Sequence, residues 1–245
     1  MDNKQSMTGI KSKERVQQHG EVFTPDSIVN DMLDLVEKEI TKDDIDKYLK
    51  ITYLEPSCGN GNFLIRILDR KMCEVQKLPK ETWVRNMLVA LSSIYGIDIQ
   101  LDNVNQSKER IINLLKDGEV PLLEIEGKEI KKWNFTAMGD MITPEVEENI
   151  RFILDENIMH GNALTGLKGT LEQAEIKAED LIVTEYTWDG DKVKLSKIAF
   201  NSIVNGTSSV IEESIKDYKE LKSNKIKQGT RNRNRVKKQE EALLF

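Results

Sequence analysis

The sequence has few of the residues that build metal sites and disulfide frameworks. Its 245 residues include two cysteines, Cys58 and Cys73, and two histidines, His19 and His160. Two cysteines make no disulfide framework, and two histidines so far apart give no zinc-ligand spacing. No run of about 18 apolar residues occurs, so we expect no membrane span. These absences predict a protein of the reducing cytoplasm that holds no metal.

The N-terminus and the charge pattern narrow the class further. The first twenty residues lack the apolar core of a secretory signal, so we expect none. The formal net charge is −6, which argues against a protein that is basic throughout. Residues 222–238 nevertheless carry eight Lys or Arg and no acid, which leaves −14 for the rest of the chain. An acidic body with a basic tail predicts a tail that contacts nucleic acid or stays solvated.

The N-terminal fifty residues predict a polar arm followed by helices. Residues up to about 20 are polar and contain no periodic apolar face. Pro25, with Asp26 or Ser27 as cap, predicts the start of a helix whose apolar residues follow helical spacing. Thr41 with Asp44 is an acidic variant of a capping box and predicts a second short helix.

The next segment alternates between strand and helix. Residues 51–54 are rich in β-formers, and a glycine-rich turn and a helix follow. Residues 80–91 predict another helix, residues 92–99 a second buried strand, and residues 101–116 a helix with one apolar face. This order is typical of an α/β fold with a parallel sheet and right-handed crossovers.

The C-terminal half gives weaker signals. Residues 117–150 support no assignment. We expect strands over 152–160, 180–188 and 192–200, a hairpin turn at Asp189-Gly190, a short helix over 211–221, and then a flexible tail. The predicted domains are an arm and helical cap (1–50), an α/β domain (51–204), and a C-terminal helix with the basic tail (205–245).

Glu55-Pro-Ser-Cys-Gly-Asn-Gly-Asn-Phe63 is the strongest functional signal. It follows the first predicted strand and opens a helix, and its two glycines let the backbone approach a ligand without a Cβ clash. Ligands of open α/β sheets bind at the carboxyl ends of strands. Asp98, at the end of the second predicted strand, can accept protons from ribose hydroxyls. A tight turn without a ligand is the simpler alternative, and the two acids at strand ends argue against it.

These residues resemble the amino-group DNA methyltransferases, and especially the N6-adenine type. EPSCGNGNFL is similar to motif I of that family, GEVFTP to its F-x-T-P element, YGIDI to its acidic motif, and IMHGNAL to the motif that follows. The resemblance implies a three-layer Rossmann-like fold that binds S-adenosylmethionine. The residues that it assigns to the cofactor are Phe23, Thr24, Pro25, Glu55, Pro56, Ser57, Cys58, Gly59, Gly61, Asn62, Phe63, Asp98, Ile99 and Asn162.

The resemblance fails at the catalytic motif. The family has D/N/S-P-P-Y/F/W at the end of the fourth strand, and this chain contains no Pro-Pro. Thr184-Glu-Tyr-Thr-Trp188 stands there instead, so the resemblance implies Glu185 as acceptor of the amino protons and Trp188 as the ring that stacks on a flipped base. The alternative is that Glu185 is an exposed strand residue and Trp188 a packed one.

The sequence therefore leaves three functional hypotheses. The first is a DNA adenine-N6 methyltransferase-like subunit of a restriction–modification system, with DNA and a specificity or other protein subunit as partners. The second is a cofactor-binding regulatory or scaffolding subunit without catalysis, which the missing Pro-Pro favours. The third is methylation of RNA, protein or a small molecule at Glu185. Only 57 residues follow Trp188, which makes sequence-specific reading of DNA by this chain alone doubtful.

Overall fold

The computed structural model describes residues 13–19, 21–38, 40, 43–118, 135–170, 179–207 and 209–222. Its helices are α1 (Lys13–His19), α2 (Asp26–Glu37), α3 (Ile45–Lys50), α4 (Asn62–Val75), α5 (Trp83–Ser92), α6 (Leu101–Asp117), α7 (Phe135–Gly139), α8 (Pro144–Asn157) and α10 (Phe200–Val204), with short 3-10 helices η1 (Lys80–Thr82) and η2 (Tyr218–Glu220). Its strands are β1 (Tyr53–Glu55), β2 (Ile94–Asp98), β3 (Ile158–Asn162), β4 (Leu167–Lys168), β5 (Ile182–Asp189), β6 (Lys192–Ala199) and β7 (Val210–Asp217).

The first four strands form one sheet in the order β1-β2-β3-β4. Strands β1, β2 and β3 are parallel, with Tyr53 opposite Ile94 and Gly96 opposite Ile158. Helices α4 and α5 lie between β1 and β2 in the chain, and α6 to α8 lie between β2 and β3. The predicted α/β class and its parallel strands are therefore confirmed. β4 runs antiparallel to β3, so the sheet as a whole is mixed.

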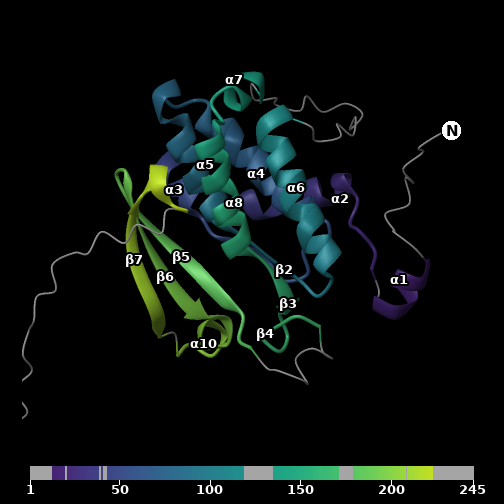
Figure 1. Cartoon of the computed structure of the whole chain (residues 1–245). Helices are drawn as coiled ribbons and strands as arrows, with labels where there is room; N and C mark the ends of the chain where they lie inside the picture. The colour runs from purple at the N-terminus through teal and green to yellow at the C-terminus, as the bar shows by residue number, and fades with distance from the viewer. Residues whose placement is uncertain are drawn as a thin grey trace, which may run out of the picture.

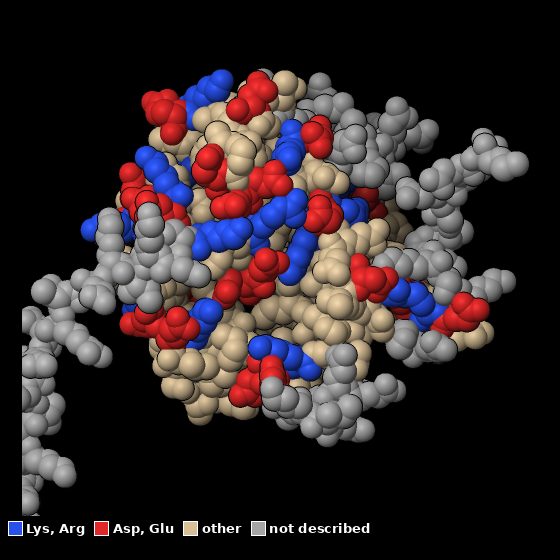
Figure 2. All heavy atoms as spheres, viewed as in Figure 1, with Lys and Arg blue, Asp and Glu red and all other residues tan. Residues whose placement is uncertain are grey.

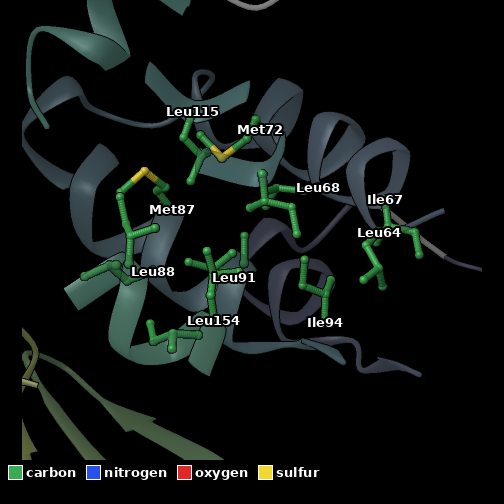
Figure 3. Packing of buried hydrophobic residues seen from close by; sticks show 14 of the residues in the cluster. Leu64, Ile67, Leu68, Met72, Met87, Leu88, Leu91, Ile94, Leu115 and Leu154 are labelled. Carbon is green, nitrogen blue, oxygen red and sulfur yellow. The ribbon is translucent and has the colours of Figure 1, made fainter. Parts of the chain in front are cut away.

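Helices cover the sheet on the side that Gly96 of β2 faces. A Cβ built at Gly96 would lie 2.8 Å from Leu64 Cδ1 of α4, so that helix packs directly on the strand. Side chains spaced by four residues along α4 face the interior and meet the other helices, because i and i+4 share one face of a helix. Figure 3 shows this core, with Leu68 and Met72 of α4 near Leu91 of α5 and Leu115 of α6, and with Leu64 of α4 near Ile94 of β2.

The opposite side of the sheet is covered differently. Tyr95 and Ile97 alternate with Gly96 along β2 and pack with Leu181, Val183 and Phe200. This cover comes from the approach to β5, from β5 itself and from the five-residue helix α10. The predicted three-layer arrangement, with helices on both faces, is thus replaced on this side by strand residues and one short helix within the described part of the chain.

A second, antiparallel sheet has the order β5-β6-β7. The predicted hairpin is confirmed, since Asp189 pairs with Lys192 and Gly190 adopts φ 56° in the turn between them. Figure 1 shows this sheet apart from the first, below α5 and α8. The resemblance aligned residues 184–188 with the end of the family's fourth strand; in the structure, they belong to β5, which begins a separate sheet. β7 pairs with β6 across the predicted domain boundary at residue 204.

Two predicted elements are wrong. Residues 211–221 were expected to be helical, but most of them lie in β7, because pairing with β6 outweighs the four-residue spacing of Ile211 and Ile215, which are 61% and 71% exposed. Residues 152–157 were expected to begin a strand, but they end α8. That helix starts eight residues earlier, where Thr143 caps it by accepting from Val146 N and Pro144 takes its first position.

The N-terminal segment also differs in detail. Part of the expected polar arm is α1, and the N-cap of α2 is Pro25, with no side-chain cap. Asp44 caps α3 by accepting from Lys47 N at 3.1 Å, so it is the N-cap of this helix and not the N3 residue of a capping box. Thr41 and the basic tail from residue 223 onward lie outside the described residues.

The surface carries both signs of charge. Figure 2 shows Lys and Arg interspersed with Asp and Glu over the visible face. Arg151, for example, contacts Glu147 and Glu109 at 2.9 Å each. In the described part of the chain, no helix combines the length and the apolar character that crossing a bilayer requires.

Candidate functional site

The candidate site lies where β1 and β2 end. Parallel strands bring their carboxyl ends to the same edge, so Glu55 of β1 and Asp98 of β2 are neighbours there. The glycine turn between β1 and α4 crosses this edge, and Cys58 N donates to Ile97 O at 2.9 Å. Gly61 is the N-cap of α4 with φ 89°, a conformation that favours glycine. The sequence therefore forms the turn for which its two glycines were singled out.

Asp98 holds this turn in place. Its Oδ2 accepts from Gly59 N at 2.8 Å, and its Oδ1 accepts from Gln100 N at 2.8 Å. Asn103 Nδ2, from the first turn of α6, donates to the same Oδ1 at 3.3 Å. Because hydrogen bonds to a carboxylate are stronger than neutral ones, Asp98 fixes the turn to β2 and α6 even without a ligand.

Residues 21–25, here called the strap, lie against the glycine turn. A Cβ at Gly59 would come within 3.1 Å of the Phe23 ring, so the ring rests on the space that the glycine leaves. Asn62 Nδ2 donates to Thr24 O at 2.9 Å and ties the strap to the start of α4. Segments about 35 residues apart in sequence, F-x-T-P and G-x-G, are thus in contact.

The strap, the turn and the two strand ends enclose a cavity of about 180 Å³. The predicted cofactor residues that line it are Phe23, Thr24, Glu55, Ser57, Cys58, Gly59, Asn62, Phe63, Asp98 and Ile99. Sequence reasoning missed five others that line it, Glu21, Val22, Asn60, Gln100 and Asn103. Their positions within GEVFTP, within the glycine turn and shortly after YGIDI were the available signal.

Four predicted cofactor residues do not line this cavity. Pro25 is the N-cap of α2, and Pro56 lies in the turn directly after Glu55. Gly61 faces α6, where a Cβ would lie 2.6 Å from Ser107 Oγ. Asn162 ends β3 and serves its own turn, in which its Oδ1 accepts from Leu164 N at 2.9 Å. Asn162 is therefore a turn residue in the structure.

The cavity is acidic. Glu21, Glu55 and Asp98 line it, and no Lys or Arg does among the described residues. Burial raises the pKa of Glu55, while a hydrogen bond from Ser57 N opposes the rise. Burial, with Asp98 nearby, raises the pKa of the Cys58 thiol to about 12, so Cys58 is protonated at neutral pH and is no nucleophile. The described residues contain no group of His, Cys, Asp and Glu that could hold a metal.

Glu185 and Trp188 lie elsewhere. They line a second cavity, of about 360 Å³, which shares no lining residue with the first. Trp188 is 8% exposed, and its Nε1 donates to Ser92 Oγ at 2.9 Å, so its ring is part of the core. Glu185 is exposed opposite Ser196. The two residues are three apart on one strand, so their side chains point to opposite faces of the sheet.

No family model matches the chain. The chain is similar to a protein of Methanocaldococcus jannaschii named "Putative type II restriction enzyme and methyltransferase". The two are 24% identical over an alignment of 208 residues, and the alignment covers 81% of this chain. The chain spans only 15% of the length of that relative. The similarity supports a distant relationship to a restriction–modification methyltransferase.

Proposed function

We propose that the cavity between the strap and the glycine turn binds S-adenosylmethionine, and that the chain is the cofactor-binding part of a DNA adenine methyltransferase-like protein. One observation carries this proposal: three motifs spread over about 80 residues, the strap, the turn and the end of β2, line a single cavity. The similarity to a restriction–modification protein agrees with it.

The residues present fit this cofactor. Gly59 lines the cavity with a φ of 52°, a conformation that favours glycine. Two buried acceptors, Glu21 Oε1 and Asn60 Oδ1, have no hydrogen-bond partner and are therefore open to donors of a ligand. A lining with carboxylates and no basic residue suits a cationic sulfonium better than a phosphate-bearing nucleotide.

The chemistry that the cofactor supplies is a methyl group on a positively charged sulfur. We propose that Phe23, Thr24 and Pro25 cover its methionine end and that Glu55 and residues 56–63 hold the amino-acid part. Asp98 would take the ribose, Ile99 would flank the adenine, and Asn162, by its position at the end of β3, would meet the adenine amino group. Asp98 also accepts a hydrogen bond from Gly59 N, so it would both hold the glycine turn in place and contact the ribose.

For the transfer step, the second hypothesis gains support from a specific observation. Trp188 is buried in the core, and Glu185 lines another cavity. Neither the Glu185 carboxylate nor the Trp188 ring therefore lines the proposed cofactor cavity. We therefore propose that this chain alone transfers methyl groups weakly or not at all. A DNA-binding partner subunit, or a further segment of a longer polypeptide, would then supply the acceptor group for the target amine.

Calorimetric titration with S-adenosylmethionine tests the binding proposal, with ATP as the phosphate-bearing comparison. We expect saturable heat with the sulfonium compound and none with ATP. Asp155→Asn is a surface control for substitutions of the cavity acids, because Asp155 is exposed, pairs with Lys108 and does not line the cavity. The absence of heat and of any thermal shift at excess S-adenosylmethionine would refute the proposal.

Transfer is measured separately with a labelled methyl group on duplex DNA, RNA and protein. We expect little incorporation into any of the three. Strong methylation of DNA that Glu185→Ala abolishes would restore Glu185 as a catalytic residue, and strong methylation of RNA or protein would favour the third hypothesis.

A further inference from the structure

Glu21, which no motif assigned, is buried beside the cavity. Its side chain is 8% exposed, although it comes from the strap at the surface of the fold. Its Oε2 accepts from Arg15 Nε at 2.6 Å and from Asn103 Nδ2 at 3.4 Å. Arg15 also contacts Asp102 of α6, with Nη1 2.5 Å from Oδ2. One oxygen of Glu21 is therefore occupied by two donors from α1 and α6.

The other carboxylate oxygen of Glu21, Oε1, accepts from no donor. Glu21 Oε1 is buried and has no hydrogen-bond partner. A carboxylate oxygen that loses water without gaining a donor is costly, so such an atom is rarely left alone in a folded protein. Asn60 Oδ1, in the glycine turn, is a second buried acceptor without a partner, and both residues line the same cavity.

The charge of the lining indicates what the missing donor is. Glu21, Glu55 and Asp98 line the cavity without a basic residue among the described ones, which favours a cationic ligand. Asp98 already accepts from Gly59 N, Gln100 N and Asn103 Nδ2, whereas Glu21 Oε1 is a buried carboxylate oxygen that accepts from no donor.

We propose that Glu21 is a ligand-binding residue whose free oxygen accepts a hydrogen bond from an ammonium or hydroxyl group of a cationic nucleoside. This inference rests on the proposed function and adds a residue and a charge preference to it. Arg15 and Asn103 are positioning residues, because they hold Oε2 and so leave Oε1 for the ligand.

Glu21→Gln tests this directly, because one amide cannot present acceptor oxygens to both Arg15 and the ligand. Its affinity for S-adenosylmethionine is measured by calorimetry, together with S-adenosylhomocysteine and 5′-methylthioadenosine. We expect a loss of about tenfold to a hundredfold for S-adenosylmethionine, the range for a hydrogen bond to a charged group. Arg15→Gln is the control: it breaks the same ion pair but keeps the carboxylate, and we expect a loss of at most about fivefold.

The three ligands identify the donor. S-adenosylhomocysteine keeps the ammonium but lacks the charged sulfur, and 5′-methylthioadenosine keeps the ribose hydroxyls but lacks the amino-acid part. If the loss in Glu21→Gln extends to 5′-methylthioadenosine, the donor is a hydroxyl; if it is confined to the other two, the donor is the ammonium. Both results support the proposal.

Two results would overturn it. One is equal affinity of Glu21→Gln and the unmodified chain for all three ligands. The other is an equal loss in Glu21→Gln and Arg15→Gln, which would mean that the ion pair only fastens the strap. Failure of the proposed function looks different, because the unmodified chain itself would then bind no S-adenosylmethionine. Thermal unfolding without ligand verifies that both variants are folded.

Discussion

Replacing Asp98 by Asn isolates the hydrogen bonds that hold the glycine turn. The two side chains have nearly the same shape, so the change leaves no cavity. In the structure, both carboxylate oxygens of Asp98 face donors only: Gly59 N at 2.8 Å on one side, and Gln100 N and Asn103 Nδ2 on the other. An Asn amide can present its oxygen to one side only. Its NH₂ group must then face an N–H donor on the other side.

The expected cost follows from these contacts. At least one charge-assisted hydrogen bond is lost, at about 1.5–3 kcal/mol, and a buried donor remains unsatisfied, at about 1–3 kcal/mol. Because these two terms overlap, we expect the free energy of unfolding to fall by about 2–4 kcal/mol. For an ordered region of this size, that corresponds to a fall in Tm of roughly 5–15 °C.

Urea unfolding of Asp98→Asn against the unmodified chain measures this change. Asp155→Asn again serves as control, since its side chain is 70% exposed and it should alter stability by no more than about 0.5 kcal/mol. If Asp98→Asn were as stable as that control, Asp98 would not clamp the turn. Its carboxylate would then be free for the ligand alone, and only the affinity for S-adenosylmethionine should fall.

Three further predictions follow from other contacts. Gly61→Ala should lower the free energy of unfolding by about 2–4 kcal/mol, because φ at this position is 89° and the added Cβ would clash with Ser107 Oγ. Adding Ser107→Gly to the same chain should recover only the part that is due to the clash. A double-mutant cycle in urea measures this part. Lys71, whose Nζ donates to Leu49 O and Ile51 O, has its pKa lowered to about 7 by burial. The unfolded chain thus binds more protons between pH 7 and 10, so stability should rise across that window by up to about 1.4 kcal/mol per pH unit, and Lys71→Met should abolish the rise in pH-dependent unfolding. Deleting residues 222–245 should remove most of the salt dependence of duplex DNA binding, whose log–log slope we expect near −4 to −5 for about five phosphate contacts; equal slopes for both chains in a salt titration would assign the tail to another role.

Local signals explain what could be predicted from the sequence. The strand before Glu55, the helix after Gly61 and the hairpin at Gly190 each depend on residues within a few positions of one another, and all three are as expected. The contact of the strap with the turn was expected only through the resemblance.

The errors arise where distant contacts decide. β7 contains two isoleucines at helical spacing, and only its pairing with β6 makes it a strand. The separation of β5 from the parallel sheet depends on what packs against Tyr95 and Ile97, which no local pattern specifies. Glu21 was missed for a similar reason, because its importance comes from Arg15 and Asn103, and the latter is 82 residues away.

Because Cys58 is buried in the glycine turn, its rate of reaction with a thiol reagent can measure how often the turn opens. The thiol is 6% exposed, lies against β2 where a Cβ on Gly96 would meet it at 3.0 Å, and is held protonated by its high pKa. Because so little of Cys58 is exposed, we expect a thiol reagent to react with it mainly while the glycine turn moves away from β2. With Cys73 replaced by Ser, the labelling rate equals the opening rate, or the opening equilibrium times the intrinsic rate of the exposed thiol. A ligand seated in the turn should slow this reaction, and the degree of slowing reports how far binding shifts the turn toward its closed state.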